Sequence, residues 1–188
     1  EYNPERAKEI LESAGCTMGD NGFYERNGEE IGFVISVMAG EQDRIDIAQA
    51  AAQQLREAGI NCTVDLPAQM DWGGQMACLI GWGSPFDADD HTYKVFGTDK
   101  GANYSGYSNE RVDEYLTLAR QSDDPAVRQE YYDLFQEELA ADPPYAFICY
   151  IDANYVASAR LQGVAPDTVL GHHGVGIFWN VQEWTISE

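Results

Sequence analysis

The stretch from residue 31 to residue 66 constrains the fold most, because it reads as a strand, a helix and a second strand in succession. Ile31 to Met38 is a largely apolar run that predicts a strand. Glu41 to Ala58 predicts a helix, since its apolar residues recur at helical spacing. Ile60 to Leu66 alternates apolar and polar residues, which is typical of a strand. A helix that joins two strands predicts a βαβ unit with parallel strands and a right-handed crossover.

The segments on either side extend this pattern. Asn3 and Pro4 are typical of a helix start, and Gly15 of its end. The dipeptide Asn27-Gly28 predicts a hairpin turn before the first strand of the βαβ unit. Gln75 to Trp82 is a nearly continuous apolar run, which predicts a third strand covered on both faces.

The second half of the chain predicts two further helices after a long loop. Residues 83–108 combine Gly, Pro, Asp, Asn and Ser with several aromatic residues, and they predict one long irregular stretch. Helices are expected from Ser108 or Asn109 to about Gln121 and from Asp124 to about Ala141. Strands are expected at 145–151 and 154–159. The predicted fold class is α/β, with a mixed sheet and flanking helices.

Composition excludes several classes of protein. The chain has 188 residues, of which 44% are hydrophobic and 23% charged, as in ordinary globular domains. A net charge of −21 would repel nucleic acid, so no nucleic-acid partner is expected. No apolar run approaches the ~20 residues of a membrane-spanning helix, and no signal peptide opens the sequence. Because the chain begins directly at a helix start, we expect it to be part of a longer polypeptide.

The cysteines do not form a recognisable metal site. Cys16, Cys62, Cys78 and Cys149 include no C-x-x-C pair and no Cys/His cluster. The last three lie in apolar runs and are expected to be buried free thiols. A disulfide stays open as the alternative for an exported protein.

Two other patterns, the histidines and an acidic segment, could indicate metal sites. The histidines are His91, His172 and His173, and the adjacent pair lies in a Gly-rich turn where successive side chains diverge. The segment FDADDHTY resembles the start of a calcium loop, but Thr92 and Thr98 stand where such a loop needs Gly and Glu. We therefore expect these carboxylates to cap backbone amides in a turn, and we expect neither a metal nor a cofactor. Neither a nucleophile elbow nor a P-loop occurs, and we expect no enzymatic activity.

Aromatic residues give the strongest local indication of a binding site. Several of them flank or lie in predicted loops, where core packing is not their automatic explanation: Trp72, Trp82, Phe86, Tyr104 and Tyr107. Trp82 ends a predicted parallel strand, and ligands usually bind at the carboxyl edge of such a sheet. The pattern predicts a pocket for an organic solute, with core packing as the alternative role of each ring.

The chain also resembles a known family over nearly its whole length. The segments YNPERAKEILESAG, NGFYERNGEEIGFVI, AAAQQLREAGINCTVDL, MACLIGWGSPFDADD and NYSGYSNERVDEYL, with the D-x-P break after ELAA, occur in that family's order. They are similar to the C-terminal part of the dipeptide-, oligopeptide- and nickel-binding proteins of ABC importers, the family 5 extracellular solute-binding proteins. The resemblance implies one lobe of a type II, periplasmic-binding-protein-like clamshell that closes on its ligand.

The resemblance also implies a set of ligand contacts. Trp82 matches the family's site tryptophan, and Pro85 replaces the Asp that holds the amine in peptide binders. The segment WGSPFD is closer to the W-G-x-P-Y-D form of the nickel-type branch, with Phe86 in place of Tyr, but FGTDKGAN lacks that branch's His. Arg44 is the candidate for binding a carboxylate. The candidate ligand contacts are Trp82, Gly83, Ser84, Phe86, Asp87, Met38, Arg44 and Trp72.

Organisation and partners follow from the same resemblance. Residues 1–165 would form a ligand-binding lobe, and residues 166–188 a tail that returns to the other, N-terminal lobe of the same polypeptide. The function implied is capture of a peptide or peptide-like solute for ABC permease subunits in the membrane. The address would be the periplasm or, with a lipid anchor, the extracellular face of the cytoplasmic membrane. The alternatives are a nickel or metal-chelate binder of the same family, a carbohydrate-active enzyme, and a structural surface domain.

Overall fold

A computed structural model describes residues 2–83, 87–150, 154–165 and 176–188 of the chain. Its contacts divide the chain into two compact units, Glu1–Gly81 and Trp82–Glu188. The first unit holds the strand-rich part of the chain, and the second holds three helices and the C-terminal segment.

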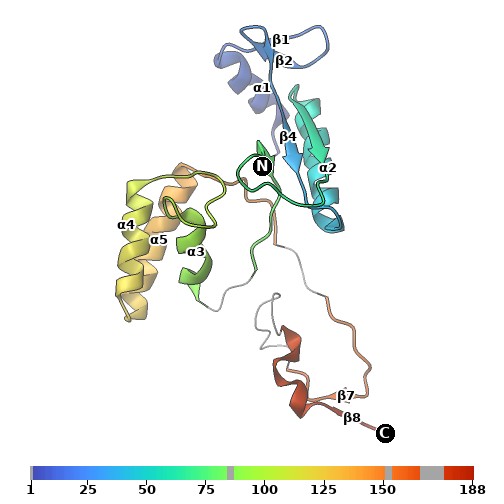
Figure 1. The fold of residues 1–188 in the computed structure, drawn as a ribbon, viewed down its shortest axis with the longest axis vertical. Helices are drawn as coiled ribbons and strands as arrows, with labels where there is room; N and C mark the ends of the chain where they lie inside the picture. The colour runs from blue at the N-terminus through green and yellow to red at the C-terminus, as the bar shows by residue number, and fades with distance from the viewer. Residues whose placement is uncertain (1, 84–86, 151–153, 166–175) are drawn as a thin grey trace. The chain divides into compact units, whose positions relative to one another are not determined.

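The first unit is built on the predicted βαβ arrangement. Strand β4 (Gly32–Ser36), helix α2 (Gln42–Glu57) and strand β5 (Asn61–Asp65) follow one another, and β4 and β5 pair in parallel. A short third strand, β6 (Ala77–Cys78), pairs in parallel with the other side of β4, which gives the order β5-β4-β6 (Figure 1). The predicted third strand is thus present but shorter than residues 75–82, and the Leu79 N–H still donates to the Ser36 carbonyl.

Helix α2 covers this sheet through a small apolar core. Val37, Ile45 and Ala48 are buried together, with Ile35, Val64 and Leu79 packed against them. These residues come from β4, α2, β5 and the segment after β6, so the core forms only when all four elements are in place. Burial of each such side chain stabilises the fold by about 1.5–3 kcal/mol.

Helix α1 and the hairpin form as the sequence predicts. Helix α1 (Pro4–Ser13) begins after Asn3, whose side chain accepts a hydrogen bond from the Arg6 backbone N–H at 2.9 Å. Strands β1 (Thr17–Met18), β2 (Tyr24–Arg26) and β3 (Glu29–Glu30) form a separate antiparallel sheet. Asn27 (φ 55°) and Gly28 (φ 81°) make the tight turn between β2 and β3, because both residue types tolerate positive φ.

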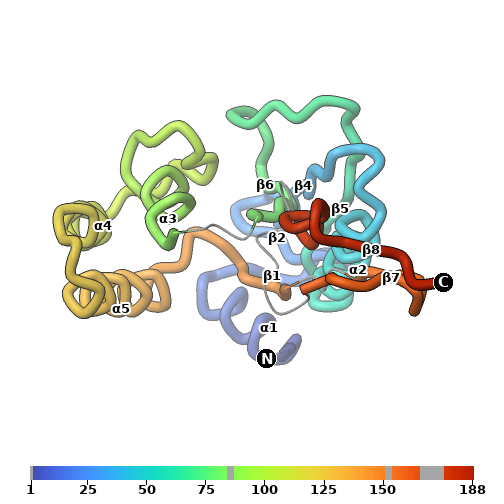
Figure 2. The backbone as a smooth tube through the Cα atoms, turned by 90° about the horizontal axis from the view of Figure 1, so that it is seen from below, coloured from blue at the N-terminus to red at the C-terminus, as the bar shows by residue number. Residues whose placement is uncertain are grey.

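The second unit contains helices α3 (Ala88–Phe96), α4 (Glu110–Gln121) and α5 (Pro125–Ala141), with α3 beside the α4/α5 pair (Figures 1 and 2). The two long helices match their predicted positions and are capped by Asn109 and Asp124. Their shared core is a single buried cluster: Val112, Leu116, Ala119, Tyr132, Phe135 and Leu139. Helix α5 contributes Tyr132, Phe135 and Leu139 to this cluster, and the partly buried Tyr131 packs against it.

The C-terminal segment has its own local structure. Strands β7 (Leu161–Gln162) and β8 (Thr185–Ile186) pair in antiparallel fashion and enclose a 3-10 turn, η2 (Ile177–Glu183). Buried Asn180 fixes this arrangement, because its Nδ2 donates to the Gly163 carbonyl at 2.8 Å and its Oδ1 accepts from Trp184 Nε1 at 2.9 Å. Inside this segment, residues 166–175, with His172 and His173, lie outside the described residues.

Two predictions for the second unit are wrong. The stretch 83–108 is not one long loop, because α3 occupies its middle. At the start of α3 the Asp87 side chain accepts a hydrogen bond from the Asp89 backbone N–H, in keeping with the expectation that these carboxylates cap backbone amides. The strands expected at 145–151 and 154–159 are absent from their described residues, where Phe147, Tyr150 and Val156 are 69%, 102% and 100% exposed. Apolar alternation alone does not make a strand when no neighbouring strand pairs with it.

The fold class is α/β, as predicted, although in the described part of the chain parallel and antiparallel strands form separate sheets. The cysteines are free thiols, of which Cys16 and Cys62 are buried, Cys78 is half-buried and Cys149 is exposed. The prediction of burial is therefore wrong for Cys149, because the strand expected around it does not form. None of the described helices is long and apolar enough to span a membrane.

Close contact between β4 and β5 gives a test of the first unit. A Cβ atom on Gly32 would lie 2.5 Å from the Asn61 carbonyl oxygen. We expect Gly32→Ala to lower the free energy of unfolding by roughly 1–3 kcal/mol, as overpacking against rigid backbone does. Urea denaturation measures this change in the free energy of unfolding. Gly73→Ala is the matched control, since a Cβ there meets no atom within 4 Å. Equal stability of the two variants would contradict the close contact.

Candidate functional site

In the first unit, two of the predicted ligand contacts lie at the carboxyl ends of the parallel strands. Met38 follows β4 and is 37% exposed, and Arg44 lies in the first turn of α2. The Arg44 guanidinium covers Gly81, where a Cβ would come within 2.9 Å of Nη2. Its side chain is 21% exposed and forms an ion pair with Glu41 at 3.4 Å. This edge therefore carries a half-buried guanidinium that is paired with one carboxylate.

Trp72 lies between β5 and β6 in the same unit and is half-buried. The same loop makes a turn in which the Gly74 backbone N–H donates to the Asp71 carbonyl at 3.1 Å. The role of Trp72 as a ligand contact stays a prediction.

In the second unit, Trp82 is the centre of an aromatic group that we call the Trp82 cluster, made of Trp82, His91 and Tyr104. The Trp82 and Tyr104 rings are stacked, with centroids 6.1 Å apart and planes at 16°. The His91 ring lies 5.5 Å from Trp82 and is tilted by 50°. Offset stacking and tilted contacts are favourable geometries for aromatic rings, so the cluster holds the indole in a defined orientation.

The polar atoms of this cluster are of interest for binding. Trp82 Nε1 and His91 Nδ1 are buried and have no hydrogen-bond partner within residues 2–83, 87–150, 154–165 and 176–188. The nearest charged neighbour of His91 Nδ1 is Asp90 Oδ2 at 3.7 Å, which is longer than a hydrogen bond. An indole N–H only donates, whereas a neutral imidazole nitrogen can accept, so the two atoms offer opposite hydrogen-bonding characters.

Asp87 is held by the protein itself. Its carboxylate accepts hydrogen bonds from the Asp89 backbone N–H at 2.8 Å and from Arg128 Nη2. These two hydrogen bonds, the first above all, hold the pKa of Asp87 below its usual value. The interpretation of these carboxylates as caps is confirmed for Asp87. Of the other residues in this segment, Gly83 is half-buried beside Trp82, and Ser84 and Phe86 lie outside the described residues.

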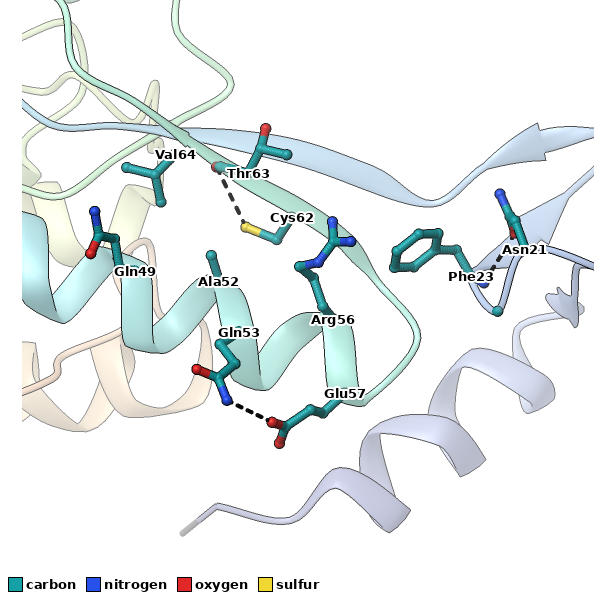
Figure 3. A pocket seen from close by; sticks show the side chains of 11 residues that line it. Asn21, Phe23, Gln49, Ala52, Gln53, Arg56, Glu57, Cys62, Thr63 and Val64 are labelled. Atoms are coloured by element: carbon teal, nitrogen blue, oxygen red, sulfur yellow. Dashed lines mark hydrogen bonds between the residues drawn. The ribbon is translucent and has the colours of Figure 1, made fainter.

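A separate hollow of about 820 Å³ lies between the C-terminal half of α2, β5 and the loop at Asn21–Phe23 (Figure 3). Its polar side chains already bind one another. Arg56 stacks over Phe23 at 4.9 Å and donates to Asn61 at 2.8 Å, and Gln53 donates to Glu57 at 3.0 Å. At its wall, burial raises the pKa of the Cys62 thiol, which keeps it protonated and unreactive. Arg56, Gln53 and Glu57 in this hollow are therefore already engaged within the protein.

Two members of the Trp82 cluster are absent from the ligand contacts predicted from the sequence. Tyr104 was singled out as an aromatic residue but not chosen, and His91 was considered only as a possible metal ligand. The i, i+4 spacing of Asp87 and His91 would place both on consecutive turns of a helix, but only once Asp87 is recognised as a helix cap. Within the described ranges, no group of three His, Cys, Asp or Glu side chains could hold a metal ion.

The paired state of Asp87 gives a pH-dependent prediction. Because its folded pKa lies below the unfolded value, the carboxylate stabilises the fold above pH ~4 and loses this contribution as pH falls through the folded pKa. Asp87→Asn keeps a good helix cap but removes the charge. We expect the variant to melt at a lower temperature than the unmodified chain at pH 7, and the difference to shrink as pH falls through the folded pKa.

Thermal unfolding followed by circular dichroism from pH 3 to pH 7 measures this difference. Asp123→Asn is the control, since Asp123 is an exposed carboxylate that precedes the cap of α5. A gap between Asp87→Asn and the unmodified chain that stays constant with pH would contradict the ion pair with Arg128.

Comparison with known proteins places these features in a family. Residues 1–104 match the family model described as bacterial extracellular solute-binding proteins, family 5. Protein XP55 of Streptomyces lividans is 33% identical over 165 residues, covering 84% of this chain and 30% of that protein. The oligopeptide-binding protein AppA of Bacillus subtilis is 26% identical over 204 residues, covering all of this chain and 35% of AppA.

Among solved structures, NikZ from Campylobacter jejuni, in complex with Ni(L-His), superimposes with a TM-score of 0.84 at 35% identity. That match covers 98% of this chain and 39% of NikZ. The chain thus spans roughly a third of the length of the relatives it matches. It belongs to family 5 of the bacterial extracellular solute-binding proteins, a family of binding proteins of ABC importers rather than of enzymes.

Proposed function

We propose that this chain is part of a protein that captures a small solute between two lobes and delivers it to the permease of an ABC importer. Family membership supports the solute-binding role. The observation that carries the proposal within the chain is the Trp82 cluster, in which a stacked, oriented indole keeps its N–H without a partner among the described residues. A rigid aromatic wall with one unsatisfied donor is suited to an organic ligand that presents an acceptor.

A peptide or peptide-like molecule is the ligand class we favour. The relative AppA is named as an oligopeptide-binding protein, and peptide backbones present both acceptors for Trp82 Nε1 and donors for His91 Nδ1. Arg44, partly paired with Glu41, is our candidate for a peptide carboxylate. Asp87 is a poor candidate for the peptide amine, because the cap and Arg128 already engage its carboxylate.

A metal chelate is the second candidate ligand. NikZ, which is 35% identical, was solved with Ni(L-His), a nickel ion carried by an amino acid. Such a complex also offers carboxylate oxygens, which an indole N–H or a guanidinium can bind. The peptide and the chelate thus share the chemistry of a carboxylate-bearing organic ligand.

The rest of the site wall is proposed to come from the other lobe of the same polypeptide. Residues 1–165 are proposed as most of one lobe, and residues 166–188 as a tail that returns to the other. Two features support this: the exposed apolar side chains of Phe147, Tyr150 and Val156, and a hollow of about 450 Å³ lined by apolar residues of the C-terminal segment, Phe178 and Trp184 among them. Surfaces of this kind are normally covered by a packing partner. A lipid anchor or a periplasmic address is proposed on the same family grounds.

The ligand class can be tested by native mass spectrometry of the full-length protein, purified without refolding. The protein is offered an equimolar mixture of di-, tri- and pentapeptides together with nickel–histidine. We expect a retained peptide adduct, which identifies the ligand for titration. Retention of nickel–histidine alone would favour the chelate, and retention of neither would contradict both ligands.

Trp82 variants test the site itself. With the ligand found by mass spectrometry, Trp82→Ala should weaken binding by roughly 1–3 kcal/mol, measured by titration calorimetry, because it removes a stacking wall. Trp82→Phe keeps a ring but removes the N–H, so it should recover part of the loss. Tyr2→Ala, at an exposed aromatic residue that precedes α1, is the control and should bind normally. Unchanged affinity of Trp82→Ala would remove Trp82 from the site.

A further inference from the structure

The N-terminus of α3 is held by two arginines that come from two different helices. Arg128, on α5, donates a hydrogen bond to Asp87, the residue that caps α3. Arg120, on α4, forms an ion pair with Asp89 in the first turn of α3, with 3.2 Å between Nε and Oδ2. The same short turn is therefore tied to both helices of the core pair.

Both arginines also contact aromatic rings. The Arg120 guanidinium carbon lies 3.9 Å from the centroid of the Tyr93 ring on α3, and that of Arg128 lies 5.8 Å from Tyr132 on α5. A guanidinium can stack on a ring and donate hydrogen bonds in its plane at the same time, whereas a lysine ammonium cannot. Each ion pair has one well-shielded member. In the Arg128–Asp87 pair the Arg128 side chain is 27% exposed, and in the Arg120–Asp89 pair the Asp89 side chain is 25% exposed.

Helix α3 needs such anchors. It has only 9 residues, too few for an isolated helix to be stable in water, and Val95 is its one buried residue. Val95 belongs to the last turn, so apolar packing fixes the C-terminal end of the helix and leaves the N-terminal end to polar contacts. His91 lies one turn after Asp87, and its ring is 5.5 Å from Trp82.

We propose that Arg120 and Arg128 are positioning residues, which hold α3 so that His91 lies against Trp82. The position of α3 is a property of this chain alone, whereas its effect on ligand binding rests on the proposed function. Removing both pairs should let the first turn of α3 move. The His91 ring should then no longer pack against the Trp82 ring.

A ligand-free experiment tests the position. Proton NMR follows the imidazole Hε1 resonance of His91 in the full-length protein, assigned with His91→Gln, because the neighbouring indole ring shifts it. In Arg120→Gln/Arg128→Gln we expect this resonance to move toward its position in an unfolded chain. Hydrogen exchange of the amides of residues 87–92 should become about tenfold faster, as expected when local anchors are removed. The lysine double variant, R120K/R128K, should recover part of both effects.

The chain supplies a matched control. Arg111 on α4 pairs with Glu138 on α5 at 2.8 Å, so it links the same two helices without touching α3. Arg111→Gln should leave the His91 resonance and the exchange of residues 87–92 unchanged. An unmoved His91 resonance in a folded Arg120→Gln/Arg128→Gln protein would overturn the proposal. Equal shifts in the glutamine and lysine variants would keep the positioning role and assign it to the planar guanidinium, which lysine lacks, rather than to charge alone.

A binding measurement separates this proposal from the proposed function. With the ligand identified by mass spectrometry, the glutamine double variant should bind at least about fivefold more weakly, and Arg111→Gln should bind normally. A moved His91 resonance with unchanged affinity would keep the positioning role and remove His91 from the ligand site. Weakened affinity with an unmoved resonance would assign the arginines to ligand contact and overturn the positioning role.

Discussion

The parallel pairing of β4 with both β5 and β6 is the constraint on which the first unit depends. Because both neighbours run parallel to β4, the carboxyl ends of all three strands lie on one edge, and helix α2 must cross over to connect two of them. The close approach of Gly32 to Asn61 and the burial of Val37, Ile45 and Ala48 keep strand and helix in register. Arg44 reaches the edge only because α2 begins there, so the charge at the candidate site is a direct product of the crossover.

The helix starts, the hairpin turn and the βαβ unit could be predicted from the sequence, because the residues that determine them lie close together in the chain. Asn3 before Pro4, Asn27 before Gly28, and Asn109 and Asp124 before their helices each act through hydrogen bonds or dihedral angles within a few residues. Such features do not depend on the rest of the chain. The βαβ unit was predictable for a related reason, since the periodicity of its helix and the apolar pattern of its strands agree with each other.

What could not be predicted depends on partners that are distant in sequence. The arginines that hold α3 lie 31 and 41 residues after the carboxylates they bind, and nothing near Asp87 indicates them. The strands expected around Cys149 and Tyr155 failed for the opposite reason. Their residue types suit a strand, but the described part of this chain offers no strand to pair with them. A sequence pattern predicts which surface of a segment is suited to burial. Whether that surface is buried depends on whether another segment packs against it.

Asp87 shows how this changes the interpretation of a candidate site. In the sequence it stands among several carboxylates that are expected to cap backbone amides, and it is also a candidate ligand contact. In the structure its carboxylate caps a helix and binds Arg128, and Asp89 binds Arg120. A ligand amine would have to displace an arginine that is largely shielded from solvent and is already hydrogen-bonded, which costs more than pairing with a free carboxylate. The carboxylates of Asp87 and Asp89 are therefore engaged in holding α3, and the ring of Trp82 and the imidazole of His91 remain our proposed ligand contacts in the second unit.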